Sequence, residues 1–181
     1  PADVDAVDTG IAEHALATRL SYFLWNSPPD AKLMQLAAQE QLRAQLEGQV
    51  HRLLDSESVW RFVRGFGREW LRMDRQELIT INVDRYPAYT RFVKRDMAEE
   101  TFHFIHHLME HDLSIFQLID SEYAMLNQNL AEFYGVKDVI GNHFRAVPLP
   151  TNSGRGGLLS QGSFLAGHSD GNEAHPIKRA V

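Results

Sequence analysis

The stretch from Tyr89 to Asp112 constrains the fold most, because it is the longest segment of the chain with an unbroken helical period. At about 100° per residue, its side chains separate into two opposite arcs. The mainly apolar arc contains Met97, Ala98, Thr101, Phe102, Phe104, Ile105, Leu108 and Met109. The opposite arc contains Asp96, Glu99, Glu100, His103, His106, His107, Glu110 and His111. We therefore expect a long helix with one core face, against which the other elements pack.

Helical spacing of apolar residues recurs on both sides of this segment. It predicts helices over about 10–25, 28–36, 42–54 and 56–71, a short one after Ser114, and another that begins at Ser121 or Asn127 and ends at Tyr134. Residues 144–149 predict one short strand or extended segment, and the polar stretch after Gly167 predicts irregular structure. The pattern indicates an all-α fold, a single helical domain of about seven or eight helices with an irregular C-terminal segment. Its expected core includes Leu20, Leu24, Trp60, Phe66, Trp70, Phe104, Ile105 and Leu108.

Composition excludes several classes of function. With 181 residues and 44% hydrophobic content, the chain can bury a core of its own. A net charge of −6 without a basic patch argues against nucleic-acid binding. The absence of cysteine excludes disulfides, thiol nucleophiles and covalent haem attachment within this chain. No apolar run reaches the roughly 18 residues that a membrane span needs. Because the chain starts at Pro1, we expect a piece of a longer protein.

The polar arc of the long helix contains a candidate metal site. Glu99, His103 and His107 follow one another at four-residue spacing, which stacks potential ligands on one face. A ferritin-like dinuclear centre would need a second Glu-x-x-His pair besides Glu100 and His103, and the sequence contains no other. Two interpretations stay open, a solvated polar face and a metal-dependent enzyme. The missing second pair favours a non-catalytic role for this chain taken alone.

Two further groups of residues near the C-terminus are candidates for ligand binding. Arg155, Gly156 and Gly157 stand before a predicted helix and offer a guanidinium and backbone amides to an anion such as a phosphate or a haem propionate. The alternative is a tight turn. His168 and His175 lie in a polar loop, where they are candidates for a metal ligand or an axial haem ligand, or are simply solvated.

Four blocks of sequence, taken together, resemble a known family. They are LATRLSYFLWNSPPDAKLMQLA, WRFVRGFGREWL, the run from MAEET through DSEYAMLNQNLAEFYGV, and RGGLLSQGSFL followed by HPIKR. In this order they are similar to the planctomycete-type, cytochrome-c-associated domain of unknown function (DUF1592 type). The last block resembles the opening of a following cytochrome-c-like domain (DUF1588 type). The resemblance thus implies a helical domain over residues 1–150 and a truncated second domain over 151–181.

This resemblance also implies in what kind of longer protein the domain occurs. We expect a scaffold or interaction domain in a large extracytoplasmic protein with a role in electron transfer. Its expected partners are adjacent c-type cytochrome domains of the same chain, which would carry the haem c, and no cofactor is expected within these 181 residues.

Overall fold

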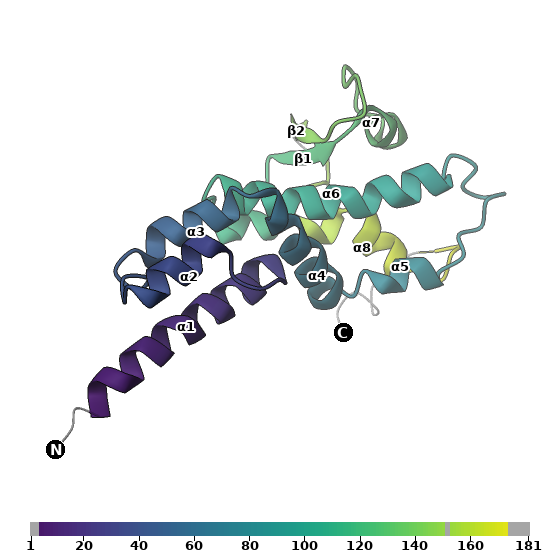
Figure 1. The fold of residues 1–181 in the computed structure, drawn as a ribbon. Coiled ribbons are helices and arrows are strands. Elements are labelled where there is room, and N and C mark those ends of the chain that lie inside the picture. Colours follow the sequence, from purple (N-terminus) through teal and green to yellow (C-terminus); the bar gives the residue numbers. More distant parts are fainter. Residues whose placement is uncertain (1–3, 151–152, 174–181) are drawn as a thin grey trace. The chain divides into compact units, whose positions relative to one another are not determined.

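The computed structural model describes residues 4–150 and 153–173 of the chain (Figure 1). These residues form eight α-helices, three short 3₁₀ helices and one two-stranded sheet. The prediction of a mainly helical fold is therefore confirmed. The chain divides into two compact units, residues 1–65 and 66–181. No helix within the described parts is both long enough and apolar enough to cross a membrane.

The first unit contains α1 (Val4–Trp25), α2 (Ala31–Ala38), α3 (Leu46–Leu54) and the 3₁₀ helix η1 (Glu57–Val59). α2 and α3 both pack on α1. The indole Nε1 of Trp25 donates a hydrogen bond to the carbonyl oxygen of Leu53 at 2.9 Å, which ties α1 to α3. The buried cluster between the helices consists of Ala17, Leu24, Leu33, Leu36, Ala37, Leu42 and Leu53.

Helix α2 begins later than its sequence predicts. The sequence predicts a start at about residue 28, for which Ser27 would be the cap, but the N-cap residue is Asp30 and the helix begins at Ala31. The Asp30 carboxylate accepts the backbone N–H of Leu33 at 2.9 Å and also pairs with Arg52 on α3 at 2.7 Å. A capping carboxylate that also joins a second helix outcompetes a serine hydroxyl at this start.

Helix α4 (Trp60–Leu71) contains the boundary between the units and is followed by the short α5 (Asp74–Leu78). A Cβ added at Gly67 would lie 3.2 Å from side-chain atoms of Phe102 and Ile105, so this glycine permits close packing. The prediction that Phe66 and Trp70 lie in the core is wrong, since Phe66 is 41% exposed and Trp70 is 49% exposed. Their rings stack on each other at 5.1 Å instead of entering the core.

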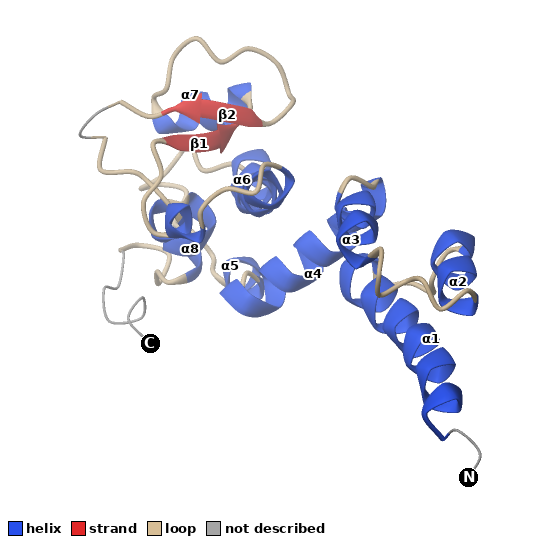
Figure 2. Ribbon diagram, turned by 90° about the vertical axis from the view of Figure 1, so that its left-hand side faces the viewer, coloured by secondary structure: helices blue, strands red, loops and turns tan. Residues whose placement is uncertain are grey.

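Helix α6 (Arg91–Glu110) is the long helix expected from the sequence. Thr90 caps it by accepting the backbone N–H of Val93 at 3.2 Å. Strand β1 (Tyr123–Leu126), α7 (Gln128–Tyr134) and α8 (Gly162–Gly167) all pack on α6. Because these elements approach from different sides, α6 has more than one buried face (Figures 1 and 2).

The expected strand is present as β2 (Arg145–Pro148), and it pairs with β1 in antiparallel register. The two strands lie side by side in Figure 2, with Tyr123 opposite Pro148 and Leu126 opposite Arg145 in the register. The start of α7 is the second of the two predicted positions, because the Asn127 side chain accepts the backbone N–H of Leu130 at 2.9 Å. The predicted short helix after Ser114 is the 3₁₀ helix η2 (Ile115–Leu118).

The described part of the C-terminal segment packs within the second unit. Leu158, in the 3₁₀ helix η3 (Leu158–Ser160), is buried in one apolar cluster with Phe104, Leu108 and Met125. A second cluster lies around α7 and contains Val93, Met97, Ala124, Leu126, Leu130, Ala131 and Val139. The proposed domain boundary between residues 150 and 151 stays a prediction about the longer protein.

Candidate functional site

The polar arc of α6 is partly buried, which its sequence pattern did not predict. Asp96 and Glu100 are each 1% exposed, because α7 and α8 cover them. Within the described residues, every buried side-chain nitrogen and oxygen atom has a hydrogen-bond partner. The buried, hydrogen-bonded polar side chains of α6 are therefore the first candidates for a functional site in the second unit.

Glu100 is the most perturbed carboxyl group on α6. The phenol of Tyr134 on α7 donates a hydrogen bond to Glu100 Oε2 at 2.7 Å, and the backbone N–H of Gly162 donates to the same phenol oxygen at 3.0 Å. Burial raises the pKa of Glu100 to about 7, although the Tyr134 hydrogen bond and the positive charge of Arg155 act in the opposite direction. Burial and the neighbouring carboxylate also raise the pKa of Tyr134. Glu100 can therefore gain or lose a proton near neutral pH.

A mainly apolar cleft of about 340 Å³ lies beside Tyr134. The guanidinium carbon of Arg155 lies 3.7 Å from the centroid of the Tyr134 ring, in a cation–π contact at the cleft wall. Other lining residues include Tyr86, Tyr89, Phe133 and Leu165. The cleft therefore combines apolar walls with one cationic and one anionic side chain, Arg155 and Glu173, and Tyr134 links it to the titratable Glu100.

The Arg155-Gly156-Gly157 loop directs its backbone amides into the protein. Gly156 N–H donates to Ser160 Oγ at 2.8 Å, and Gly157 N–H donates to Ser121 Oγ at 3.1 Å. Gly157 has φ +66°, and a Cβ there would lie 2.4 Å from the carbonyl oxygen of Ile119. The loop thus has a packing role, while the predicted haem or anion contact of Arg155, Gly156 and Gly157 stays a prediction.

Asp96 has its hydrogen-bonding positions filled by neighbours. Its Oδ2 accepts the side-chain amides of Asn127 at 2.9 Å and Asn129 at 2.8 Å, and Arg95 pairs with Oδ1 at 2.7 Å. Although burial acts to raise the pKa of Asp96, these donors hold it below its ordinary value. This carboxylate therefore joins α6 to the start of α7.

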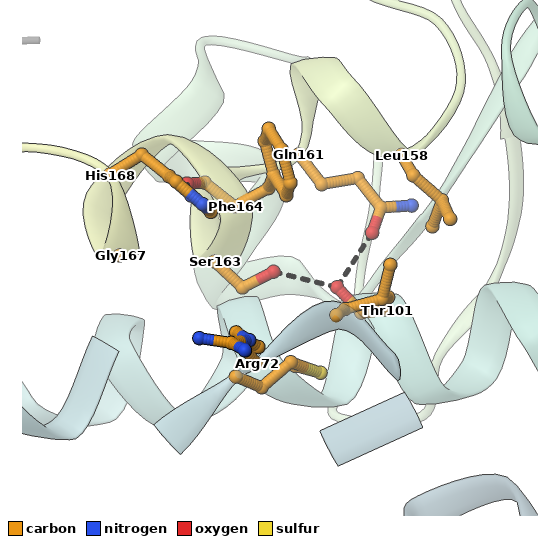
Figure 3. A pocket seen from close by; sticks show the side chains of 10 residues that line it. Arg72, Thr101, Leu158, Gln161, Ser163, Phe164, Gly167 and His168 are labelled. Atoms are coloured by element: carbon orange, nitrogen blue, oxygen red, sulfur yellow. Dashed lines mark hydrogen bonds between the residues drawn. The ribbon is translucent and has the colours of Figure 1, made fainter. Parts of the chain in front are cut away.

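A small cavity of about 10 Å³ with a mixed polar and apolar lining lies between α6 and α8 (Figure 3). Thr101 Oγ1 donates to Gln161 Oε1 at 2.6 Å and lies 2.7 Å from Ser163 Oγ (Figure 3). His168 also lines the cavity, and its Nδ1 lies 2.8 Å from the carbonyl oxygen of Phe164. The cavity has room for about one water molecule. His168 as a haem or anion contact stays a prediction, and His175 lies outside the described residues.

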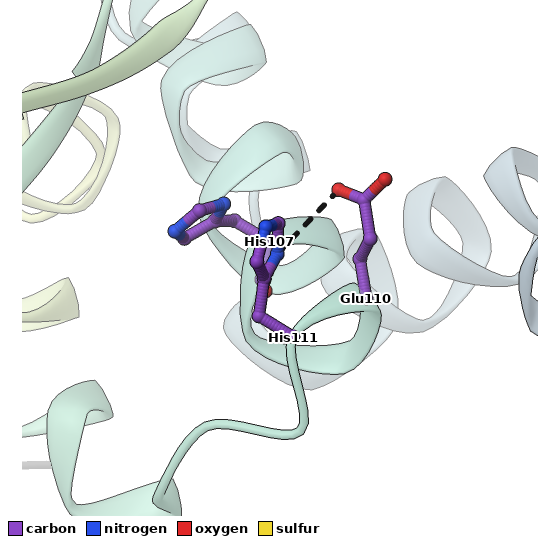
Figure 4. Close-up of side chains that lie close together, drawn as sticks. All are labelled: His107, Glu110 and His111. Atoms are coloured by element: carbon purple, nitrogen blue, oxygen red, sulfur yellow. Dashed lines mark hydrogen bonds and ion pairs between the residues drawn. The ribbon is translucent and has the colours of Figure 1, made fainter.

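The predicted metal ligands Glu99, His103 and His107 do not gather around one point. The His103 ring stacks on Phe144 with centroids 4.6 Å apart. Among the described residues, one group of potential ligands lies close together, and it consists of His107, Glu110 and His111 (Figure 4). Burial and the neighbouring His111 lower the pKa of His107. The sequence signal that we missed is the four-residue spacing of His107 and His111, which is the spacing of paired metal ligands on a helix, with Glu110 between them.

The fold and the polar groups along α6 define a mainly helical domain built around one central helix in its second unit. A family model described as PSD4, Protein of unknown function (DUF1592), matches residues 11–136, which is more than half of the chain, so the chain belongs to this family. The resemblance found in the sequence blocks is thereby confirmed for this family, while the following DUF1588-type domain stays a prediction. Neither a curated protein nor a solved structure matches the chain.

Proposed function

We propose that this chain is a non-catalytic interaction domain of a longer extracytoplasmic protein, in which it positions an adjacent c-type cytochrome domain for electron transfer. The support for cytochrome-containing neighbours is the resemblance of the four sequence blocks to a cytochrome-c-associated domain, whereas the family match itself gives a domain of unknown function. The haem c would belong to those neighbours. The polar groups along α6 would then stabilise the domain, as the filled hydrogen-bonding positions of Asp96 indicate.

One surface feature carries the proposal. Ile115, Phe116 and Ile119 on and next to η2 are 71%, 75% and 68% exposed, so three large apolar side chains face solvent within five residues. Each such side chain contributes roughly 1.5–3 kcal/mol when it is fully buried. Exposed apolar groups gathered in this way are typical of protein interfaces. We call these three residues the η2 cluster.

The charged residues next to the η2 cluster indicate which kind of partner surface would complement it. Asp112 precedes the cluster and Asp120 and Glu122 follow it, and all three side chains are exposed. An apolar centre with an acidic rim complements an apolar patch with a basic rim. We therefore propose a cytochrome surface of that composition as the occupant.

The proposal is tested by calorimetric titration of the chain with the adjacent cytochrome domain. The sequence downstream of Val181 must first show a Cys-x-x-Cys-His haem-attachment motif, and its absence there and elsewhere in the protein would overturn the proposal. The triple change of Ile115, Phe116 and Ile119 to Ser should weaken binding by at least about tenfold, corresponding to 1.4 kcal/mol. The matched control is Ile140→Ser, since Ile140 is 77% exposed and lies outside the η2 cluster. Equal affinity of the triple variant and the wild type would contradict the proposal.

A further inference from the structure

We propose that His107, Glu110 and His111 form a binding site for a divalent transition-metal ion, with Zn²⁺ as its best match. One ligand atom from each of the three side chains lies within 4.8 Å of the other two. All three residues belong to the last turn of α6 and the residue that follows it (Figure 4). The site is separate from the Glu100 network and does not depend on the proposed function.

The spacing of the two histidines suits a shared ion. His107 and His111 are four residues apart, so both rings project from the same side of the helix end. Their ring centroids lie 4.2 Å apart, and His111 Nδ1 lies 3.7 Å from Glu110 Oε2. The His111 side chain thus lies next to the side chains of both His107 and Glu110.

The three side chains can close onto an ion without movement of the backbone. Zn²⁺ bonds of 2.0–2.2 Å in a tetrahedral arrangement place two ligand atoms about 3.4 Å apart. The ligand atoms must therefore approach by roughly 1.5 Å, which rotation about side-chain bonds supplies. The side chains of Glu110 and His111 are 53% and 51% exposed, so such rotation meets little obstruction.

The surroundings of the three residues favour a bound cation. The C-terminal end of a helix carries partial negative charge from its last carbonyl groups. When Nδ1 of His111 carries the proton, it donates to the carbonyl oxygen of His107 at 3.2 Å, which leaves Nε2 as a ligand atom. A hydrogen bond from the second ring nitrogen to a carbonyl is the usual arrangement of metal-binding histidines. His106 Nδ1 lies 3.5 Å from Glu110 Oε2 and helps to hold that carboxylate in place.

The chemistry of the ligands selects the class of ion. Two imidazoles and one carboxylate suit Zn²⁺ and other late first-row ions, whereas Mg²⁺ and Ca²⁺ prefer all-oxygen sites. Three protein ligands leave a fourth position for water or for a group of another molecule. The proposed site therefore keeps one coordination position of the metal ion free of protein ligands.

The test is calorimetric titration of the tag-free chain with ZnCl₂. We expect one saturable site of micromolar affinity, at least about tenfold weaker binding in His107→Ala and in His111→Ala, and loss of the site in the double variant. Glu110→Gln should also weaken binding. The matched control is His51→Ala, because His51 is exposed on α3 in the other unit and should leave the affinity unchanged.

A second readout separates binding from folding. Saturating Zn²⁺ should raise the melting temperature of the wild type, because a ligand that binds only the folded state stabilises it, and MgCl₂ should not. Circular dichroism without metal should show the same helix content in the wild type and the double variant. The proposal is overturned if the wild type binds no Zn²⁺ at micromolar concentration, or if the correctly folded double variant binds it equally well.

Discussion

The phenol of Tyr134 donates a hydrogen bond to the buried carboxyl group of Glu100 across 2.7 Å. Because the backbone N–H of Gly162 donates to the same phenol oxygen, this one side chain connects α6, α7 and the start of α8. A Cβ at Gly162 would lie 2.5 Å from that oxygen, so the contact also requires glycine there. The second unit thus depends on a polar connection within its interior as well as on apolar packing.

Removal of the Tyr134 hydroxyl should destabilise the chain. Tyr134→Phe leaves both the buried carboxyl group of Glu100 and the N–H of Gly162 without this partner, so we expect the free energy of unfolding to fall by about 1–3 kcal/mol. Urea unfolding measures the change. Tyr22→Phe is the control, because Tyr22 is 50% exposed, and it should change stability by less than about 0.5 kcal/mol. Equal effects of the two substitutions would show that the Tyr134 hydrogen bonds contribute nothing.

The contribution of Glu100 to the stability of the chain should fall as pH rises toward neutrality. The pKa of Glu100 is raised from 4.5 to about 7, so between these values the folded state binds more protons than the unfolded state. The stabilisation is fully present below pH 4.5 and is lost as pH rises through about 7. The loss approaches roughly 3 kcal/mol for this fully buried group.

The pH prediction is checked by urea unfolding at several pH values. Glu100→Gln should remove this part of the pH dependence, because an amide does not titrate. Glu122→Gln makes the same change at an exposed position and should leave the dependence as in the wild type. A Glu100→Gln curve with the same slope between pH 5 and 7 as the wild-type curve would refute the assignment.

The sequence predicts the helices of this chain better than it predicts their surroundings. The span of α6 and its role as a packing centre follow from periodicity, whereas the capping signals left two starts open for α7, of which the structure has Asn127. Periodicity assigns one buried face to a helix, whereas α6 is covered by elements from different sides, and so Asp96 and Glu100 were placed on the solvent face. The predicted burial of Phe66 failed because a helical stripe does not show how much of it another element covers.

The candidate sites were less predictable, because their contacts join residues far apart in the chain. Tyr134 lies 34 positions from Glu100, and nothing local in the sequence relates the two. The group at the end of α6 could have been found, since His107 and His111 have the four-residue spacing of paired metal ligands. The four-residue spacing of Glu99, His103 and His107 is an equally good match to the same pattern, so the sequence alone does not select the group at the helix end. Short α5 was also missed, because its five residues are too few for a periodic signal.

Loss of the Asp96 carboxylate should be among the more damaging changes in the second unit. Asp96→Ala leaves the amides of Asn127 and Asn129 and the guanidinium of Arg95 without their shared acceptor, and we expect a loss of about 3 kcal/mol. Asp84→Ala removes a carboxylate from an exposed position and should cost less than about 0.5 kcal/mol. Thermal unfolding followed by circular dichroism compares them, and similar melting temperatures would contradict the anchoring role of Asp96.

Two glycine substitutions should change stability in opposite directions. Gly157→Ala forces a Cβ into a left-handed backbone position and against the carbonyl oxygen of Ile119, so we expect it to cost about 1–3 kcal/mol. Gly65→Ala lies within α4 and has no neighbouring atom within 4 Å, so it should stabilise the chain by about 0.5–1 kcal/mol. Chemical unfolding of both variants is the measurement. A neutral or stabilising Gly157→Ala would show that this loop does not pack as described.

The most direct test of the account is to locate the contact between this chain and its proposed cytochrome partner. Isoleucine-methyl NMR spectra of the chain, recorded during titration with the oxidised cytochrome domain, report which side chains approach the partner. The proposal predicts that the methyl signals of Ile115 and Ile119 shift or broaden, while those of Ile140, which is 77% exposed elsewhere, stay unchanged. Spectra without any change at saturating cytochrome, or with changes confined to other isoleucines, would contradict the proposed interaction domain.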